Sequence, residues 1–132
     1  MFSKKKQPPI KSLIAPGTRI TGDIRFCDGL RIDGEIQGNL MAVEGQPSLL
    51  VISESALITG EIVADHLIIN GTVRGPVVAR VLLELQPKAR VEGNVSYHAL
   101  EMHQGASITG LLGRIPVVAD DKPALKLAAN NG

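Results

Sequence analysis

The sequence predicts an all-β fold: a parallel β-solenoid (β-helix) of about six coils with a triangular cross-section and a short tail at each end. Three observations predict it. Five columns of similar residues recur six times, successive copies lie about 17 residues apart, and the apolar side chains are mostly Ile, Leu and Val rather than large aromatics. Self-similarity at a nearly fixed period is typical of stacked repeats.

The repeat is clearest at residues 30–40, which read L-R-I-D-G-E-I-Q-G-N-L. Apolar or small residues alternate strictly with polar ones there, so we expect them to share one buried face of the chain. Two glycines on that face, Gly34 and Gly38, indicate a chain that turns tightly or packs very closely. The second glycine anchors all six copies of the core repeat, namely Gly22, Gly38, Gly60, Gly75, Gly93 and Gly110.

Four further columns accompany the anchor glycine. The residues two before and two after it are apolar, the residue four before it is small, and the residue eight before it is apolar. The anchors lie 16, 22, 15, 18 and 17 residues apart, and the long interval contains residues 44–48, which we interpret as an inserted turn. This period is too short for strand–helix–strand units but suits three short strands and three corners. Coils stacked about 4.8 Å apart would give a rod on the order of 25 to 30 Å long.

Residues 1–11 are predicted to form a disordered tail, because Pro8 and Pro9 oppose helix and strand. Phe2 beside a run of lysines allows two interpretations. It is either a solvated start that aids solubility or a membrane-surface anchor, in which the phenylalanine enters the interface and the lysines contact anionic headgroups. The tail carries four lysines and no acidic residue: Lys4, Lys5, Lys6 and Lys11.

Residues 12–115 hold the six repeats and are predicted to be the solenoid domain. Residues 116–132 lack the columns and are predicted to be a disordered C-terminal tail. No apolar run approaches the roughly 18 to 20 residues that span a bilayer, and the start lacks the apolar segment of a secretory signal. We therefore expect a cytosolic protein, and the single cysteine, Cys27, fits a reducing compartment.

The sequence contains little that indicates catalysis. No phosphate-binding glycine loop occurs, no Cys/His set has metal-ligand spacing, and a formal net charge of +1 argues against a general nucleic-acid binder. We expect no cofactor and no nucleotide. Solenoid acyltransferases use a loop histidine as a base, but no long loop is present here to build a cleft. We therefore interpret His66, His98 and His103 as surface histidines and Cys27 as a passive thiol.

The two ends of the predicted rod carry the functional signal. A parallel solenoid exposes unpaired backbone N–H and C=O groups at each end, and such edges template further strands unless they are capped. The first and last coils are as apolar as the middle ones, and neither tail reads as an amphipathic cap. We expect end-to-end stacking into a filament, with contacts from Ile14, Ile20, Ile24, Met102, Ile108 and Leu112.

These features together resemble the bactofilin family. The resemblance rests on the G-x-[IVL] coils across residues 12–115, the stretch at 30–40, the M-F-S-K-K-K start and the short proline-containing tails. It implies a bacterial cytoskeletal protein with a right-handed triangular β-helix. It also implies nucleotide-independent filaments without overall polarity, in which head-to-head and tail-to-tail contacts alternate.

The resemblance further implies attachment to the inner face of the cytoplasmic membrane and recruitment of cell-wall synthases or hydrolases that shape the cell. The membrane-targeting candidates then become Met1, Phe2, Lys4, Lys5 and Lys6. An apolar residue in the last coil matters for polymerisation in the family, and Leu111 and Leu112 match it by position. Three hypotheses follow: a polymerising membrane-associated scaffold, a β-solenoid acyltransferase, and a monomeric binding module that uses its flat faces.

Overall fold

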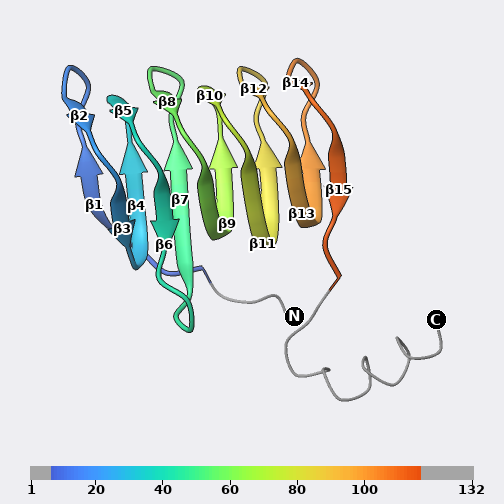
Figure 1. Ribbon diagram of the computed structural model, residues 1–132, viewed down its shortest axis with the longest axis horizontal. Helices are drawn as coiled ribbons and strands as arrows, with labels where there is room; N and C mark the ends of the chain where they lie inside the picture. Colours follow the sequence, from blue (N-terminus) through green and yellow to red (C-terminus); the bar gives the residue numbers. More distant parts are fainter. Residues whose placement is uncertain (1–6, 117–132) are drawn as a thin grey trace.

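The computed structural model describes residues 7–116, which form a β-solenoid of six coils (Figure 1). Neighbouring strands pair in parallel throughout, so like positions of successive coils lie side by side. This arrangement confirms the fold class that the repeat predicts. Among the described residues there is no helix, and hence none that is long and apolar enough to cross a bilayer.

Fifteen short strands build the walls of the rod. One wall is a six-stranded sheet of β2 (Arg19–Thr21), β5 (Glu35–Gln37), β8 (Leu57–Thr59), β10 (Thr72–Arg74), β12 (Arg90–Glu92) and β14 (Ser107–Thr109). The other nine strands form one sheet: β1 (Ile10–Ile14), β3 (Ile24–Phe26), β4 (Asp28–Ile32), β6 (Leu40–Ala42), β7 (Ser48–Ile52), β9 (Ile62–Ile69), β11 (Val77–Leu85), β13 (Val95–Met102) and β15 (Leu112–Arg114).

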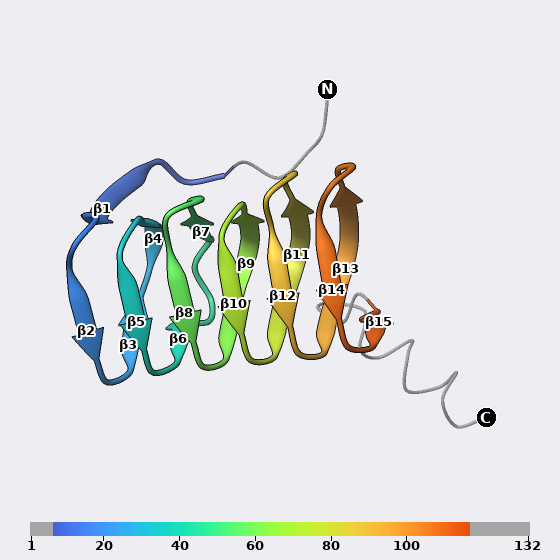
Figure 2. The same ribbon diagram turned by 90° about the horizontal axis from the view of Figure 1, so that it is seen from above.

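The nine-stranded sheet supplies two walls because it bends around a corner. The first halves of β9, β11 and β13 continue the wall of β3 and β6, and their second halves continue the wall of β1, β4 and β7. The pairing register shifts between Ala79 and Leu82, where β11 turns the corner. Three walls and three corners per coil give the predicted triangular section, and Figure 2 shows the coils stacked in chain order. Coil one is β1–β3 and coil two is β4–β6. Coil three runs from β7 to the first half of β9, and coil four runs from the second half of β9 to the first half of β11. Coil five ends in the first half of β13, and coil six runs from its second half to β15.

Aliphatic side chains fill the interior, one column per inward position. Because strand residues alternate between faces, the inward residue of each coil stacks on its counterpart in the next. Burying such a side chain contributes about 1.5 to 3 kcal/mol. The largest side chains with no exposed surface are Ile32, Ile36, Leu40, Leu50, Ile52, Ile58, Ile62, Leu67, Ile69, Leu83, Leu85 and Val73.

The anchor glycines form a corner of the rod, between the six-stranded wall and the next. All six have φ angles between 131° and 157°, which favours glycine. At Gly38, an added Cβ would lie 2.0 Å from the carbonyl oxygen of Gly22 in the coil below. The stretch at 30–40 is therefore three strands joined at corners rather than one straight strand. Gly34 is buried as expected, but Gly38 lies at a half-buried corner and not on a buried face.

The inserted turn is confirmed between β6 and β7, where residues 43–47 extend one corner. A polar network attaches it to the rod. The amide of Ser48 donates to Asp65 Oδ2 at 3.2 Å, and the amide of Asp65 donates to Ser48 Oγ at 2.9 Å. Arg80 Nε donates to Asp65 Oδ1 at 2.8 Å. The pairing registers of β7 with β4 and with β9 run without a shift, so the longer corner leaves the stacking of coils unchanged.

Candidate polymerisation surfaces at the two end coils

The C-terminal end of the stack leaves an interior column uncovered. Leu40, Ile62, Val77 and Val95 occupy one inward column and are at most 1% exposed, whereas Leu112, the last member, is 47% exposed. The difference arises because coil six has no following coil among the described residues. A leucine that packs on one side only offers its other side to a further coil.

The other candidates on coil six show the same one-sided environment. Met102 is 47% exposed, although Ile69 and Leu85 in its column are fully buried. Ile108 is half-buried and packs against the core. Leu111 precedes β15 at a corner and is 75% exposed, so it borders the end of the stack rather than lining the interior column.

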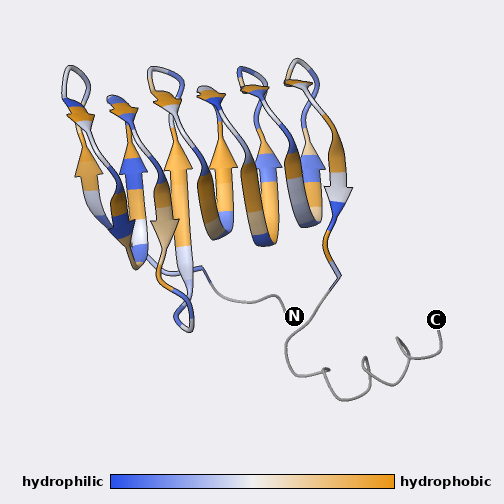
Figure 3. Cartoon of the chain, viewed as in Figure 1, coloured by the Kyte–Doolittle hydropathy of each residue, from blue (hydrophilic) through white to orange (hydrophobic). Residues whose placement is uncertain are grey.

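The N-terminal end has a matching set on coil one. Ile14, Ile20 and Ile24 are half-buried and pack against the core only from the side of coil two. The sequence did not single out Leu13, which is 57% exposed on the outer side of β1. The signal was present, because a leucine occupies an outward position of β1 where coil two has Arg31. Figure 3 shows apolar residues on β1 and at the start of β15, as on the middle coils.

Both ends also carry backbone groups without a coil to pair with. At the anchor corner, the amides of each coil donate to the next, as Gly93 does to Thr109 and Val95 to Leu111. The corresponding amides of Gly110 and Leu112 have no following coil within residues 7–116. At coil one, Ile14 accepts from Asp33, but the amide of Ala15 has no preceding coil to donate to. Such open edges favour the addition of further strands.

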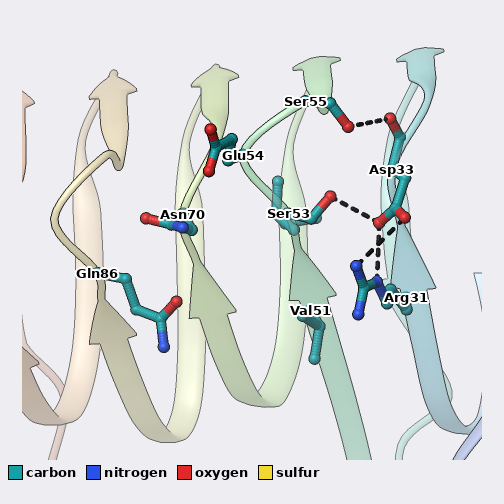
Figure 4. A pocket seen from close by; sticks show the side chains of 9 residues that line it. Arg31, Asp33, Val51, Ser53, Glu54, Ser55, Asn70 and Gln86 are labelled. Atoms are coloured by element: carbon teal, nitrogen blue, oxygen red, sulfur yellow. Dashed lines mark hydrogen bonds and ion pairs between the residues drawn. The ribbon is translucent and has the colours of Figure 1, made fainter. Parts of the chain in front are cut away.

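A polar cleft of about 510 Å³ lies on the outer walls, and its lining includes Arg31, Asp33 and Ser53 (Figure 4). Arg31 Nε donates to Asp33 Oδ1 at 2.8 Å, and Ser53 Oγ donates to the same oxygen at 2.6 Å. The hydrogen bond from Arg31 and that from Ser53 hold the pKa of Asp33 below its ordinary value. A carboxylate stabilised in this way is a poor general base. The lining of the cleft extends from Arg31 in coil two to Gln86 in coil five.

The three histidines differ in burial. His98 is half-buried and His103 is exposed, with His103 Nε2 3.1 Å from Glu84 Oε2. The expectation of a surface histidine is wrong for His66, which is only 5% exposed. Glu84, Glu101 and His103 bring potential ligand atoms within 4.8 Å of one another. Glu101 and His103 are exposed, and exposed acidic groups commonly lie together without a metal ion.

Two further sequence-based assignments concern other parts of the chain. The membrane-targeting candidates Met1, Phe2, Lys4, Lys5 and Lys6 lie outside the described residues, as do residues 117–132 of the C-terminal tail. The passive thiol, Cys27, is exposed and unpaired with any cysteine. The structure therefore places the expected assembly residues at two opposite ends of the rod and leaves the anchor residues to experiment.

Comparison with known proteins agrees with this picture. The sequence matches the model of the bactofilin family, described as polymer-forming and cytoskeletal, over residues 12–112. Among solved structures, the fold is similar to a cryo-EM reconstruction of double helical bactofilin filaments from Thermus thermophilus. The TM-score is 0.67 at 27% sequence identity, and the match covers 80% of this chain and 100% of the other. No curated protein matches the sequence.

Proposed function

Because this chain belongs to the bactofilin family, a polymer-forming cytoskeletal family, we propose that its filaments grow end to end through the exposed faces of coils one and six. The observation that carries the proposal is the exposure of Leu112 and Met102 in columns that are fully buried in the coils between the two ends. A joint between two ends would bury these side chains and pair the open backbone edges. Following the family, we propose alternating head-to-head and tail-to-tail joints and a filament without polarity.

Assembly through such joints requires no nucleotide, because backbone pairing and apolar burial supply the driving force. Negative-stain electron microscopy of the purified protein, without added nucleotide or divalent cation, is expected to show filaments. Filaments that form only after nucleotide is added would contradict the proposal. A discrete trimer would favour the acyltransferase alternative, and a lasting monomer would favour a binding module.

We also propose that the filaments lie at the inner face of the cytoplasmic membrane, held there by residues 1–6, and organise cell-wall machinery. A lysine near an anionic surface is worth about 1 kcal/mol, and burial of one phenylalanine adds roughly 1.5 to 3 kcal/mol. One copy would bind weakly. Many copies along one filament would bind firmly, since every attachment after the first is intramolecular.

Deleting residues 2–6 is expected to abolish co-sedimentation with vesicles that contain anionic lipid, while filaments still form. The reason is that the deletion removes Phe2 and the three lysines from every copy at once. A matched control deletes residues 128–132, which is the same number of residues from the other end. Co-sedimentation that is unchanged by the first deletion, or equally lost in the second, would remove the membrane proposal.

A further inference from the structure

The described part of the N-terminal segment crosses the outside of the rod. We call residues 7–10 the strap. Ile10 pairs with Gly29 in coil two, and an added Cβ at Gly29 would lie 2.3 Å from the carbonyl oxygen of Pro9. Three residues earlier, Gln7 Nε2 lies 3.5 Å from Nδ1 of His66 in coil four. The strap therefore runs along the rod axis, across the strands, as Figure 2 shows.

The strap explains two buried side chains that point outward. Leu49 and His66 alternate along their strands with the interior residues Leu50 and Leu67, yet they are only 6% and 5% exposed. Leu49 is buried without belonging to the interior cluster. They share an outward column with Gly29, and that column continues through Leu82 and Ala99 in coils five and six. Leu82 is half-buried and Ala99 is exposed, so the cover ends at coil four.

A groove begins where the strap ends. It has a volume of about 570 Å³, its lining starts at Gln7, and it continues over coils five and six. The rest of its lining is His66, Val81, Leu82, His98, Ala99 and Glu101. Its floor is apolar at Val81, Leu82 and Ala99, and Glu101 supplies a carboxylate at one side.

A second feature beside the groove calls for a cation. Glu84 and Glu101 pair directly on neighbouring strands, so their carboxylates lie side by side. Like charges at directly opposite positions are unfavourable in a sheet. His103 Nε2 lies 3.1 Å from Glu84 Oε2, and among the described residues no ion pair reaches Glu101. Lysine ammonium groups at this position would relieve the repulsion.

We propose that residues 2–6 of the same chain dock in this groove as a continuation of the strap. An extended segment advances about 3.1 to 3.4 Å per residue, and successive coils are about 4.8 Å apart. Lys6, Lys5 and Lys4 then pass over coils five and six. Their methylene stems lie on the apolar floor and their ammonium groups reach Glu84 and Glu101. At this spacing Lys4 lies over Ala99 in coil six, and Phe2 lies beyond that coil.

Docking and membrane attachment exclude each other, because both use the same five residues. In the docked state residues 2–6 are bound to the groove, and an anionic membrane surface competes with the groove for them. This regulatory meaning rests on the proposed membrane function, but docking itself is a property of the free protein and is tested without lipid.

Disulfide trapping tests the proposal in the full-length protein. In a Cys27→Ser background, Lys4→Cys is combined with Ala99→Cys in the groove, or with Ser107→Cys on the six-stranded wall of the same coil. Under mild oxidation, docking raises the local concentration of the first pair. We expect an intramolecular disulfide, seen at monomer mass on a non-reducing gel, to form at least about tenfold faster for Ala99 than for Ser107. Equal rates, or crosslinks mainly at dimer mass, would overturn the proposal.

Charge variants and vesicles complete the test. Glu84→Lys with Glu101→Lys is expected to remove the preference for Ala99, whereas Glu92→Lys, on the six-stranded wall, is expected to leave it unchanged. A preference that survives the double change would overturn the role of the carboxylates. Anionic vesicles are expected to slow the Ala99 disulfide. If the filaments bind the vesicles and the Ala99 disulfide forms at an unchanged rate, docking and membrane attachment do not exclude each other. If the Ala99 disulfide forms but the filaments do not bind the vesicles, only the membrane proposal is wrong.

Discussion

Leu112→Arg is expected to abolish long filaments while the rod stays folded. Leu112 is already 47% exposed, so the guanidinium of the isolated protein can reach water. In an end-to-end joint the same charge would be buried without a partner, which costs about 3 to 5 kcal/mol. Since about 1.4 kcal/mol corresponds to a tenfold change in an equilibrium constant, the association constant of the joint falls by more than about a hundredfold. Pelleting and electron microscopy measure the loss of filaments, and circular dichroism checks that the fold is retained.

The product of this substitution also reports the polarity of the filament. If tail-to-tail and head-to-head joints alternate, Leu112→Arg breaks only the joints between coils six, and dimers held by coil one remain. If every joint is head-to-tail, each joint is broken and monomers result. Analytical ultracentrifugation separates these outcomes. Thr109→Arg serves as the control, because Thr109 is exposed on the outer side of coil six. Long filaments of Leu112→Arg would show that this face is not the contact.

The column pattern was enough to predict the fold, because in a stacked repeat one-dimensional periodicity determines the three-dimensional neighbours. Leu30, Ile36 and Leu40 are buried as the alternation predicts. The same logic located the candidate joints, since Ile14 and Met102 belong to columns that end there. Which residues form end coils follows from chain order alone.

What the pattern did not predict depends on contacts made across the repeat. His66 repeats no column residue and lies near a corner, so an exposed position was the natural expectation. It is buried because the strap, which packs on Gly29, crosses the strands of coils two to four. Gly38 was assigned to a buried face because alternation does not distinguish a strand residue from a corner residue. Its φ of 157° and the closeness of Gly22 are properties of the stack.

Gly75→Ala is expected to destabilise the rod more than any single truncation in its interior. The added Cβ would lie 2.2 Å from the carbonyl oxygen of Gly60, which is backbone and is held in the ladder between coils three and four. The φ of 150° adds strain that a glycine avoids, of order 1 to 3 kcal/mol. Separating the coils would also break ladder hydrogen bonds, and each buried group left unpaired costs about 1 to 3 kcal/mol.

The sum approaches the whole stability of a domain, about 5 to 15 kcal/mol, so we expect the variant to be largely unfolded. The break falls at the middle of the stack, and three coils on either side bury too little surface to fold well alone. Substitutions at two other glycines separate the effect of positive-φ strain from the effect of close contact with the neighbouring coil. Gly45 has a φ of 87° but open space around its Cβ, and Gly113 has open space and no such strain. Gly45→Ala is expected to cost about 1 kcal/mol and Gly113→Ala almost nothing.

Thermal unfolding followed by circular dichroism measures this series, with every variant placed in the Leu112→Arg background. Assembly stabilises the folded state by mass action, and a shared background without filaments, studied at one protein concentration, keeps any remaining contribution of assembly equal in all variants. If Gly75→Ala has the same melting temperature as Gly45→Ala, only the backbone strain at positive φ matters, and neighbouring coils separate at little cost. Filament growth extends the same ladder of backbone hydrogen bonds. If coils within the rod tolerate a wider spacing, end-to-end joints would also form without close contact between the backbones of the two end coils.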